Sequence, residues 1–360
     1  MNTQLFDLYT DYLVCTFRQA TATGMEEVTD RFASHDDVTR MLATEIKTRK
    51  LLWTTVKPLV RQVQSDDGVV IFDDVIIAKP HTDENDIICW HFDHASGQSV
   101  KGIQMMTALY QNKDVSLPLA TQIIAKTEQY TDEKTGIIKR RSPVTKNEYL
   151  KQMLRYINTL QVPYKYVLAD SWYASADNMK FVHDTLKKHF VFALKQNRKV
   201  ALSAQDKRHG KYINVCDLIL NSDQAITVYV EDVSFPLRLA KHDFTNEDGT
   251  SGTMFLISDH TTLSGADMLA IYKRRWNVEQ YHKSLKQNTA IAKSPTRTER
   301  TQSNHVLASV CAYVKLESLK VKTKLNHFAV KGKLYSKAIL SAWDELHEMR
   351  KRLDKDRAFA

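Results

Sequence analysis

The chain has 360 residues with 43% hydrophobic and 26% charged content, which is ordinary for a soluble globular protein and long enough for two or three modules. The formal net charge of +9 leaves two interpretations open, a polyanionic partner such as nucleic acid or a merely basic soluble enzyme. The four scattered cysteines form no zinc or redox motif, and the sequence has neither a secretory signal nor an apolar run near the roughly 20 residues of a membrane span, so we expect a cytoplasmic protein.

The first 65 residues are predicted to be helical. Apolar side chains recur there at helical spacing, namely Leu5, Leu8, Tyr9 and Tyr12. Ser34, with Asp37 three residues later, is typical of the start of a capped helix. Two short helices around a turn that contains Gly24 predict a helix-turn-helix DNA-binding region, with a small helical packing domain as the alternative.

From Val69 the sequence predicts a β-sheet. The run Val69–Ala78 is nearly all apolar and rich in branched residues, which is typical of a buried strand. A second strand is expected over residues 87–94 and a third over Ile103–Tyr110, with Gly97 in the turn between them. Three strands in this order predict an antiparallel meander.

Helices and strands alternate after the meander. The expected elements are a helix over Asn147–Leu160, a strand over Tyr164–Asp170, a helix over Ala176–Lys188 and a strand over Phe190–Leu194. The resulting order β-β-β-α-β-α-β is that of a ribonuclease H-like α/β fold, in which helical crossovers connect the parallel strands.

The remaining sequence completes four predicted parts. Residues 197–258 contain several short strands and form a β-rich insertion, after which Ser264 caps a long helix. A further helix is expected over Val306–Lys320, followed by a charged helical tail. The predicted domains are a helical N-terminal DNA-binding region (1–65), a ribonuclease H-like catalytic core (66–196 and 259–322), the β-strand insertion (197–258) and a helical C-terminal region (323–360).

Four side chains on the long helix form one spaced set. Tyr272, Arg275, Glu279 and Lys286 fall within an arc of about 60°, at roughly 100° per helical residue. One face therefore carries an acid, two cations and an aromatic ring, while the roughly opposite face is apolar. The acid suits a metal cation and the two cations suit phosphate oxygens, so this face predicts binding of a metal-bound phosphodiester.

Three acids are the candidate catalytic residues and metal ligands. Asp74, or its neighbour Asp73, lies in the first strand, Asp170 ends the fourth strand, and Glu279 is on the long helix. The first and fourth strands are adjacent in a ribonuclease H-like sheet, so these carboxylates are expected to converge. Converging acids repel one another unless a divalent cation compensates them, and oxygen ligands suit Mg²⁺ or Mn²⁺. Two such ions about 4 Å apart would support an in-line phosphoryl displacement.

These motifs resemble those of a known family. The Tyr-x₂-Arg-x₃-Glu-x₆-Lys spacing from Tyr272 to Lys286 is similar to the signature around the third acid of bacterial DDE transposases of the IS-four (Tn-five-like) group. Residues 73–75 (Asp-Asp-Val) and residues 168–173 resemble the first-acid and second-acid motifs of that group. The resemblance covers roughly residues 66–320, and the β-rich stretch matches the insertion of the group.

The resemblance implies an activity and its partners. Members of the group cut DNA at transposon ends with an acidic triad and two Mg²⁺ ions, for which Mn²⁺ substitutes, and join the freed 3′-hydroxyl to target DNA. A cut-and-paste transposase is thus implied, an endonuclease and strand transferase that binds double-stranded DNA at terminal inverted repeats and at the target. The resemblance also implies a homodimer in the synaptic complex and a place in the bacterial cytoplasm at the nucleoid. By the same resemblance, Arg275 and Lys286 hold terminal phosphates and Tyr272 contacts the end nucleotides.

The identity of the first acid is ambiguous in the sequence. Asp73 and Asp74 are adjacent, and strand alternation points them to opposite faces. Motifs of the family commonly place the ligand just before a threonine. Val75 occupies that position here, which favours Asp74 over Asp73.

Basic and aromatic residues surround the predicted site. Residues 271–300 carry eight basic side chains and two acids, which is consistent with a DNA channel or with a solvated charged face. The candidate DNA-binding residues are Tyr272, Arg274, Arg275, Trp276, Lys283 and Lys286. Trp172 and Tyr173 are candidates for stacking on a displaced base, with core packing as the alternative.

Other functions stay open beside the transposase. One is a ribonuclease H-like DNA nuclease that hydrolyses DNA without strand transfer. Another is an inactive derivative that only binds DNA, although the intact acids argue against it. For Glu279, the structural alternative is an exposed helical acid paired with Arg275 and Lys283.

Overall fold

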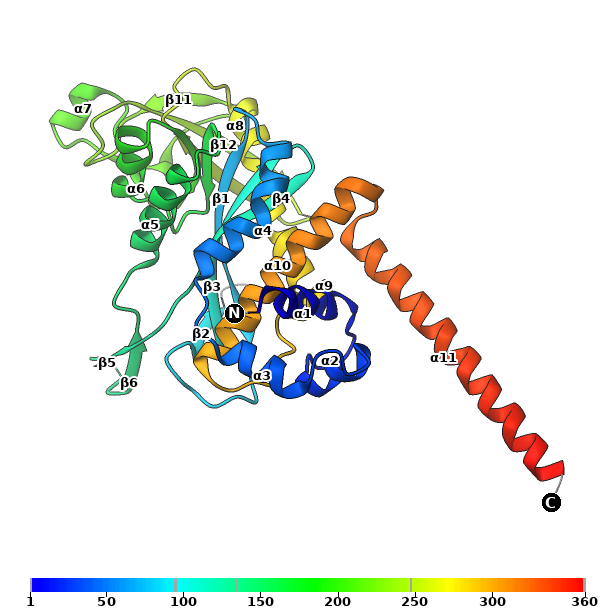
Figure 1. Ribbon diagram of the computed structural model, residues 1–360. Helices are drawn as coiled ribbons and strands as arrows, with labels where there is room; N and C mark the ends of the chain where they lie inside the picture. The colour runs from blue at the N-terminus through cyan, green and yellow to red at the C-terminus, as the bar shows by residue number, and fades with distance from the viewer. Residues whose placement is uncertain (1, 94–95, 134, 247, 359–360) are drawn as a thin grey trace. The chain divides into compact units, whose positions relative to one another are not determined.

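The computed structural model describes residues 2–93, 96–133, 135–246 and 248–358 (Figure 1). The chain divides into two compact units, one formed by Met1–Ile46 with Ser284–Ala360 and the other by Lys47–Lys283. The larger unit, Lys47–Lys283, contains all three of the acids that the sequence singles out.

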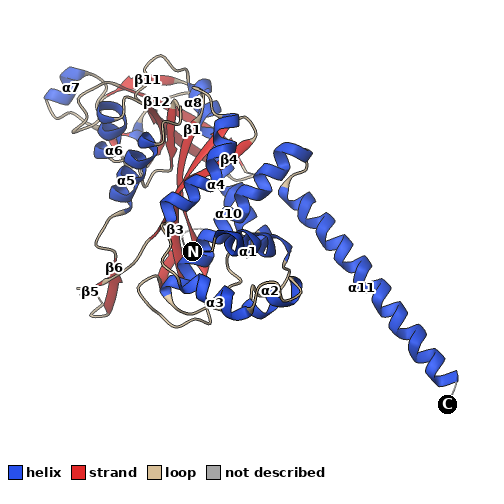
Figure 2. Ribbon diagram, viewed as in Figure 1, coloured by secondary structure: helices blue, strands red, loops and turns tan. Residues whose placement is uncertain are grey.

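The larger unit is built on a mixed sheet that holds nine strands within the described residues. All strands are drawn in red in Figure 2. Five of them form the ribonuclease H-like part of the sheet, namely β4 (Val115–Ile123), β3 (Gln98–Asn112), β1 (Val69–Ala78), β7 (Tyr166–Ala169) and β8 (His189–Leu194). Strand β3 pairs antiparallel with both β4 and β1, β7 runs parallel to β1, and β8 runs parallel to β7. The order β4-β3-β1-β7-β8 is that of a ribonuclease H-like core, so the predicted α/β fold class is confirmed.

The antiparallel part differs from the predicted meander. The strand expected over residues 87–94 is β2 (Ile88–Asp93), which pairs with β3 and not with β1, and His94 lies outside the described residues. Strand β4 is missing from the prediction because Pro118 has no backbone N–H to donate and argues against a strand. The register between β3 and β4 shifts beside Leu109, the residue that pairs with Pro118, so an irregularity in the ladder accommodates the proline.

Helices and a hairpin accompany the sheet in this unit. Helices α4 (Thr48–Val63) and α5 (Lys146–Thr159) both contact β4. Helix α6 (Ala176–Lys180) continues into one π-helical turn, η1 (Phe181–Thr185), where the sequence predicts a single helix. The chain between β4 and α5 forms a separate hairpin, with strands β5 (Glu128–Thr131) and β6 (Ile138–Arg141).

The β-rich insertion extends the main sheet. Strands β11 (Ala225–Val228), β12 (Leu237–Thr245) and β13 (Ser251–Ser258) form an antiparallel ladder, and β13 pairs antiparallel with β8. The short elements before them are β9 (Lys199–Val200), α7 (Ala204–Arg208), β10 (Ile213–Asn214) and the 3₁₀ turn η2 (Val215–Asp217). These residues therefore add strands to the edge of the main sheet beyond β8.

The long helix predicted after Ser264 is interrupted. It consists of α8 (Gly265–Lys273), the 3₁₀ turn η3 (Arg274–Trp276) and α9 (Asn277–Asn288). Ser264 and Asp267 form a capping box at the start of α8, as the sequence indicates. Because a 3₁₀ turn is wound more tightly than an α-helix, it changes the angular relation between side chains on α8 and those on α9.

The elements of the smaller unit are α1 (Thr3–Cys15), α2 (Ala22–Val28), α3 (His35–Ala43), α10 (Glu299–Thr323) and α11 (His327–Ala358), with the last residues of α9. Polar contacts join α10 to the N-terminal helices. Tyr9 Oη lies 2.8 Å from His305 Nδ1, and Asn304 Nδ2 donates to the carbonyl oxygens of Leu42 and Thr44 at 2.7 and 2.8 Å. Across the described residues, no helix combines the length and apolar character needed to cross a membrane.

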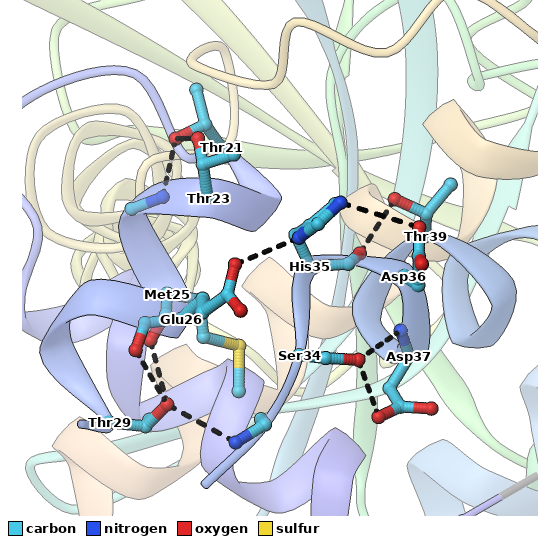
Figure 3. Close-up of polar contacts among 12 residues, drawn as sticks. Thr21, Thr23, Met25, Glu26, Thr29, Ser34, His35, Asp36, Asp37 and Thr39 are labelled. Atoms are coloured by element: carbon cyan, nitrogen blue, oxygen red, sulfur yellow. Dashed lines mark hydrogen bonds and ion pairs between the residues drawn. The ribbon is translucent and has the colours of Figure 1, made fainter. Parts of the chain in front are cut away.

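The turn predicted at Gly24 lies elsewhere. Gly24 is inside α2, because the Thr21 side chain caps this helix by accepting the backbone N–H of Gly24. The turn between α2 and α3 spans residues 29–34, and His35 Nδ1 lies 2.8 Å from Glu26 Oε2 across it (Figure 3). Residues 1–46 carry three basic and eight acidic side chains, a balance that does not favour contact with phosphates.

Candidate active site

Two acids lie side by side at the ends of the ladder between the parallel strands β1 and β7. Strands β1 and β7 pair through Phe72 and Ala169, and Asp73 and Asp170 are the next residues along the chain. Partner residues of parallel strands point to the same face, so this register places the two carboxylates on one side, at the carboxyl end of β7. The charge of Asp170 also contributes to raising the pKa of Asp73, as expected for neighbouring acids.

One guanidinium connects Asp73 with Glu279. Arg275 Nη1 lies 3.4 Å from Asp73 Oδ2, and Arg275 Nη2 donates a hydrogen bond of 2.9 Å to Glu279 Oε1. The turn η3 carries Arg275, and the first turn of α9 carries Glu279. The side chains of Asp73 and Arg275 are only 19% and 17% exposed, whereas that of Glu279 is 37% exposed. The site is therefore a partly buried group of acids around a single arginine.

The two strand acids are poorly compensated. Burial raises the pKa of Asp73 to about 7, with Arg275 opposing the shift and Asp170 adding to it. Burial also raises the pKa of Asp170, against the backbone N–H of Trp172 and the charge of Arg275. Both shifts mean that the ionised carboxylates lack favourable partners, which a bound cation would supply.

Asp74, which the sequence favours as the first acid, points away from Arg275. Its Oδ2 accepts a hydrogen bond of 2.6 Å from Gln104 Nε2, and its Oδ1 accepts one of 3.0 Å from Tyr173 Oη. Lys146 Nζ lies 3.0 and 2.9 Å from the two oxygens. Strand alternation thus gives the two neighbours different partners. Arg275 links Asp73 to Glu279, whereas the charge of Asp74 adds to burial in raising the pKa of Asp170.

Tyr272 and Arg274 make contacts within the protein. Tyr272 is 8% exposed, and the guanidinium carbon of Arg275 lies 5.7 Å from the centroid of its ring. Arg274 Nε donates to Gln111 Oε1 at 2.6 Å, and its other nitrogens bind the carbonyl oxygens of Asp67 and Gln111. These contacts position the turn η3 and engage the guanidinium of Arg274 within the protein, which argues against the predicted DNA contact.

Other predicted DNA-binding residues are exposed. Trp276 is 59% exposed, and Lys283 and Lys286 are exposed on α9. Lys286 belongs to the smaller unit, whereas Glu279 belongs to the larger one. Trp172, beside Asp170, is 58% exposed, with Lys195 Nζ 4.3 Å from its ring centroid.

Two side chains that contact Asp74 were not assigned to the site from the sequence, namely Gln104 and Lys146. Gln104 is on β3, in the strand face shared with Asp74, because Met106 pairs with Asp74. Lys146 begins α5. Tyr173, a candidate for base stacking in the sequence, is 1% exposed and therefore packs in the core. The register of β1 against β3 and the position of α5 bring Gln104 and Lys146 to Asp74, and no local motif signals these two residues.

Two protein families match long stretches of the chain. Residues 137–315 match the family described as transposase DDE domain, and residues 3–213 match the family described as DDE superfamily endonuclease. The first match includes Asp170 and Glu279, and the second includes Asp73 and Asp170. No curated protein matches the chain.

Two solved structures show distant similarity. The Drosophila P element transposase strand transfer complex is 11% identical, with 51% of this chain and 36% of that chain covered and a TM-score of 0.27. The Mos1 strand transfer complex is 13% identical, with 46% of this chain and 51% of that chain covered and a TM-score of 0.17. Each match covers well under two thirds of the solved chain.

Proposed function

The chain belongs to the DDE superfamily of endonucleases, and we propose that it is a transposase that cleaves DNA at insertion-sequence ends and transfers those ends into target DNA. The observation that carries this proposal is the group formed by Asp73, Asp170 and Glu279 around Arg275 in a ribonuclease H-like sheet. The IS-four grouping, the terminal inverted repeats as binding sites and the cut-and-paste route are parts of the same proposal, which the family resemblance of the sequence supports.

We assign the role of first acid to Asp73. It lies level with Asp170 in the β1–β7 register, and Arg275 links it to Glu279. The oxygens of Asp74 are already occupied by three donor side chains, so a metal ion would have to displace them.

The three acids fit divalent cations by their chemistry. Carboxylate oxygens are the ligands that Mg²⁺ and Mn²⁺ prefer, and burial raises the pKa values of Asp73 and Asp170, a penalty on the ionised form that a bound cation would offset. We propose that Asp73, Asp170 and Glu279 hold two Mg²⁺ ions, for which Mn²⁺ substitutes. Bound metal would activate the attacking oxygen and stabilise the leaving oxygen of the phosphodiester. Within the described residues no three His, Cys, Asp or Glu side chains are grouped closely enough to hold an ion as they stand.

Arg275 has two roles in the proposal. In the structure, its one guanidinium contacts both Asp73 and Glu279. When these acids hold metal, its planar nitrogens become available to a phosphate of the DNA end, which a guanidinium binds with two parallel hydrogen bonds. The guanidinium of Arg275 lies over the ring of Tyr272, so Tyr272 would affect DNA binding by positioning Arg275.

Exposed residues of η3 and α9 supply the proposed DNA surface. Trp276 follows Arg275 directly and is 59% exposed, which suits contact with a base or sugar. Lys283 and Lys286 are exposed on α9 and suit phosphate contacts. We propose that double-stranded DNA, both at the transposon end and at the target, lies along these residues.

A homodimer is the proposed active form. Helix α11 exposes several large apolar side chains, namely Tyr335, Ile339, Leu340, Trp343, Leu346 and Met349. Contiguous exposed apolar side chains often mark protein–protein contacts, which supports self-association. Light scattering after size exclusion, with and without end DNA, measures it.

The function is tested with a donor plasmid that carries the insertion-sequence ends. With Mg²⁺, we expect excision of the segment between the ends, and with pre-cut end duplexes we expect products covalently joined to target DNA. Chelation of the metal should abolish both products. Cleavage without joined product would reduce the proposal to a nuclease, and DNA binding without any cleavage would overturn it.

A further inference from the structure

Asp74 has donors on all sides. It accepts hydrogen bonds from Gln104 Nε2 at 2.6 Å and Tyr173 Oη at 3.0 Å, and Lys146 Nζ bridges its two oxygens at 3.0 and 2.9 Å. An ionised carboxylate has about four lone-pair positions, and these contacts use all of them. The side chain is 19% exposed, so its charge is compensated by protein groups more than by water.

The three donors belong to three different elements. Gln104 is on β3, Lys146 is the first residue of α5, and Tyr173 lies in the segment that follows β7. Asp74 therefore ties the carboxyl half of β1 to the neighbouring strand, to a crossover helix and to the segment that carries Asp170.

Tyr173 is the link to the proposed catalytic acid. Its backbone N–H donates to the carbonyl oxygen of Asp170 at 3.2 Å, and the backbone N–H of Trp172 donates to Asp170 Oδ1 at 2.9 Å. On its other side, the carbonyl oxygen of Tyr173 accepts from Asn178 Nδ2 at 2.9 Å. The tight turn from Asp170 to Tyr173 is thus held at its far end by the hydroxyl bond to Asp74.

We propose that Asp74 is a positioning residue that, through Tyr173 and with Lys146 as its counter-charge, fixes the turn carrying Asp170 beside Asp73. The inference rests on the proposed function, because it gives the two adjacent aspartates of β1 different roles in the same reaction. In this proposal Asp73 is a metal ligand, whereas Asp74 fixes the positions of the neighbouring protein groups through its hydrogen bonds. Lys146 keeps the added negative charge of Asp74 from acting fully on the neighbouring acids.

The test compares Asp74→Asn and Tyr173→Phe with Asp73→Asn. Two quantities are measured, Mn²⁺ binding by titration calorimetry and nicking of supercoiled plasmid in Mn²⁺. Mutation of a residue that orients a metal ligand typically lowers metal affinity or activity by about 10- to 100-fold. We expect a nicking rate lowered by about that factor in Asp74→Asn and Tyr173→Phe, with the number of bound Mn²⁺ ions unchanged. Asp73→Asn should lose bound Mn²⁺ and all nicking.

Two further variants separate positioning from general loss of structure. Tyr164→Phe removes the hydroxyl of another buried tyrosine, one that makes no hydrogen bond in the structure, and should nick at the wild-type rate. The double variant Asp74→Asn/Tyr173→Phe should be little slower than either single variant, because both changes break the same contact. Lys146→Arg, which keeps the charge, should retain more activity than Lys146→Met.

The outcomes distinguish the inference from the function on which it rests. Loss of bound Mn²⁺ in Asp74→Asn would show that Asp74 is a ligand and overturn the inference. Wild-type nicking by both Asp74→Asn and Tyr173→Phe would also overturn it, with the transposase proposal intact. A wild-type protein that neither binds Mn²⁺ nor nicks DNA would instead overturn the proposed function.

Discussion

Buried aspartates stand at the two ends of the same parallel strands, and their surroundings differ. Beyond the carboxyl end of β7, Asp73 and Asp170 share the charge of Arg275, and the pKa of Asp73 rises to about 7 through burial. At the start of β8, the side chain of Asp259 is fully buried. His183 Nδ1 and His189 Nδ1 lie 2.8 and 3.0 Å from its Oδ2, and the backbone N–H of Phe190 donates to its Oδ1 at 2.9 Å.

By this difference, Asp259 has the contacts of an acid that stabilises the fold, whereas Asp73 and Asp170 have the incomplete compensation expected of the proposed metal ligands. Asp259 is buried more deeply than Asp73, yet three donors satisfy its two oxygens. Asp73 is left with a guanidinium at 3.4 Å and the backbone N–H of Asp74 at 2.9 Å. Burial alone therefore does not mark the functional site, whereas burial with incomplete compensation does.

The largest expected effect is on cleavage. The proposed metal ions require the charge of each site acid, and three substitutions each remove one such charge, namely Asp73→Asn, Asp170→Asn and Glu279→Gln. The rate of plasmid excision should therefore fall by a factor on the order of 10⁴, or to background. Binding of end DNA in a gel-shift assay should persist. The matched control is Asp259→Asn, which alters a buried acid of the same sheet and should still cut DNA at 20 °C.

The comparison would break if Asp259→Asn, still folded by circular dichroism, lost cleavage as completely as Asp73→Asn. It would break equally if any of the three site variants kept full excision in Mg²⁺.

A second effect concerns the stability of the metal-free protein. The folded-state pKa of Asp73, about 7, exceeds its usual value of 3.8, so the folded protein holds this proton over a wider pH range. Stability from this group is present below about pH 4 and is lost as the pH rises to about 7. At about 1.4 kcal/mol for each pKa unit, the loss reaches about 4 kcal/mol. Asp73→Asn should therefore raise the urea midpoint in EDTA at pH 8 and change it little at pH 4.

The control for this experiment is added Mg²⁺. Saturating metal should stabilise the wild type at pH 8 and leave Asp73→Asn almost unchanged, because binding to the folded state alone adds stability. If the urea midpoint of the wild type did not vary between pH 4 and pH 8, the charge of Asp73 would not be uncompensated as proposed.

Asp259 should show the reverse behaviour. Asp259→Asn leaves one acceptor for Phe190 but removes the charged oxygen that faces His183 and His189. Removing a buried hydrogen-bond acceptor leaves its donors unsatisfied and costs about 1 to 3 kcal/mol, so the urea midpoint should fall. A midpoint equal to that of the wild type would show that the histidines do not depend on this acid.

The smallest effect is expected for single phosphate contacts. Lys286→Gln should lower the slope of log affinity against log salt by about 1 in a gel-shift titration with end DNA, since one lysine–phosphate contact is lost. Lys113→Gln, at the exposed turn between β3 and β4, is the matched control and should leave the slope unchanged. An equal slope for both variants would remove Lys286 from the proposed DNA surface.

Much of the sheet could be predicted from the sequence because its strands are apolar runs and its crossovers are periodic. The run Val69–Ala78 and the alternation that follows it indicate a ribonuclease H-like order. The pairing of β3 with β1 could not be predicted, because β2 follows β1 along the chain and a simple meander would pair these two. Strand β4 was missed because it contains Pro118. Pairing depends on long-range packing that local patterns do not encode.

The site was predictable in part. The spacing around Glu279 and the position of Asp170 at a strand end point to acids that meet. Alternation says that Asp73 and Asp74 face opposite sides, but which side receives Arg275 and which receives Lys146 depends on where η3 and α5 pack. Asp259 gave no signal, because its histidine partners are about seventy residues away along the chain.

The insertion that pairs with β8 also has a consequence for solubility. Without β13, the ladder of β8 from Val191 to Leu194 would end in unpaired N–H and carbonyl groups beside large apolar side chains such as Phe192. Open edges of this kind recruit strands from other molecules, and proteins that keep them tend to aggregate. Strand β13 thus shields the main sheet from self-templated assembly, and shortened versions of this chain need a replacement strand on that edge.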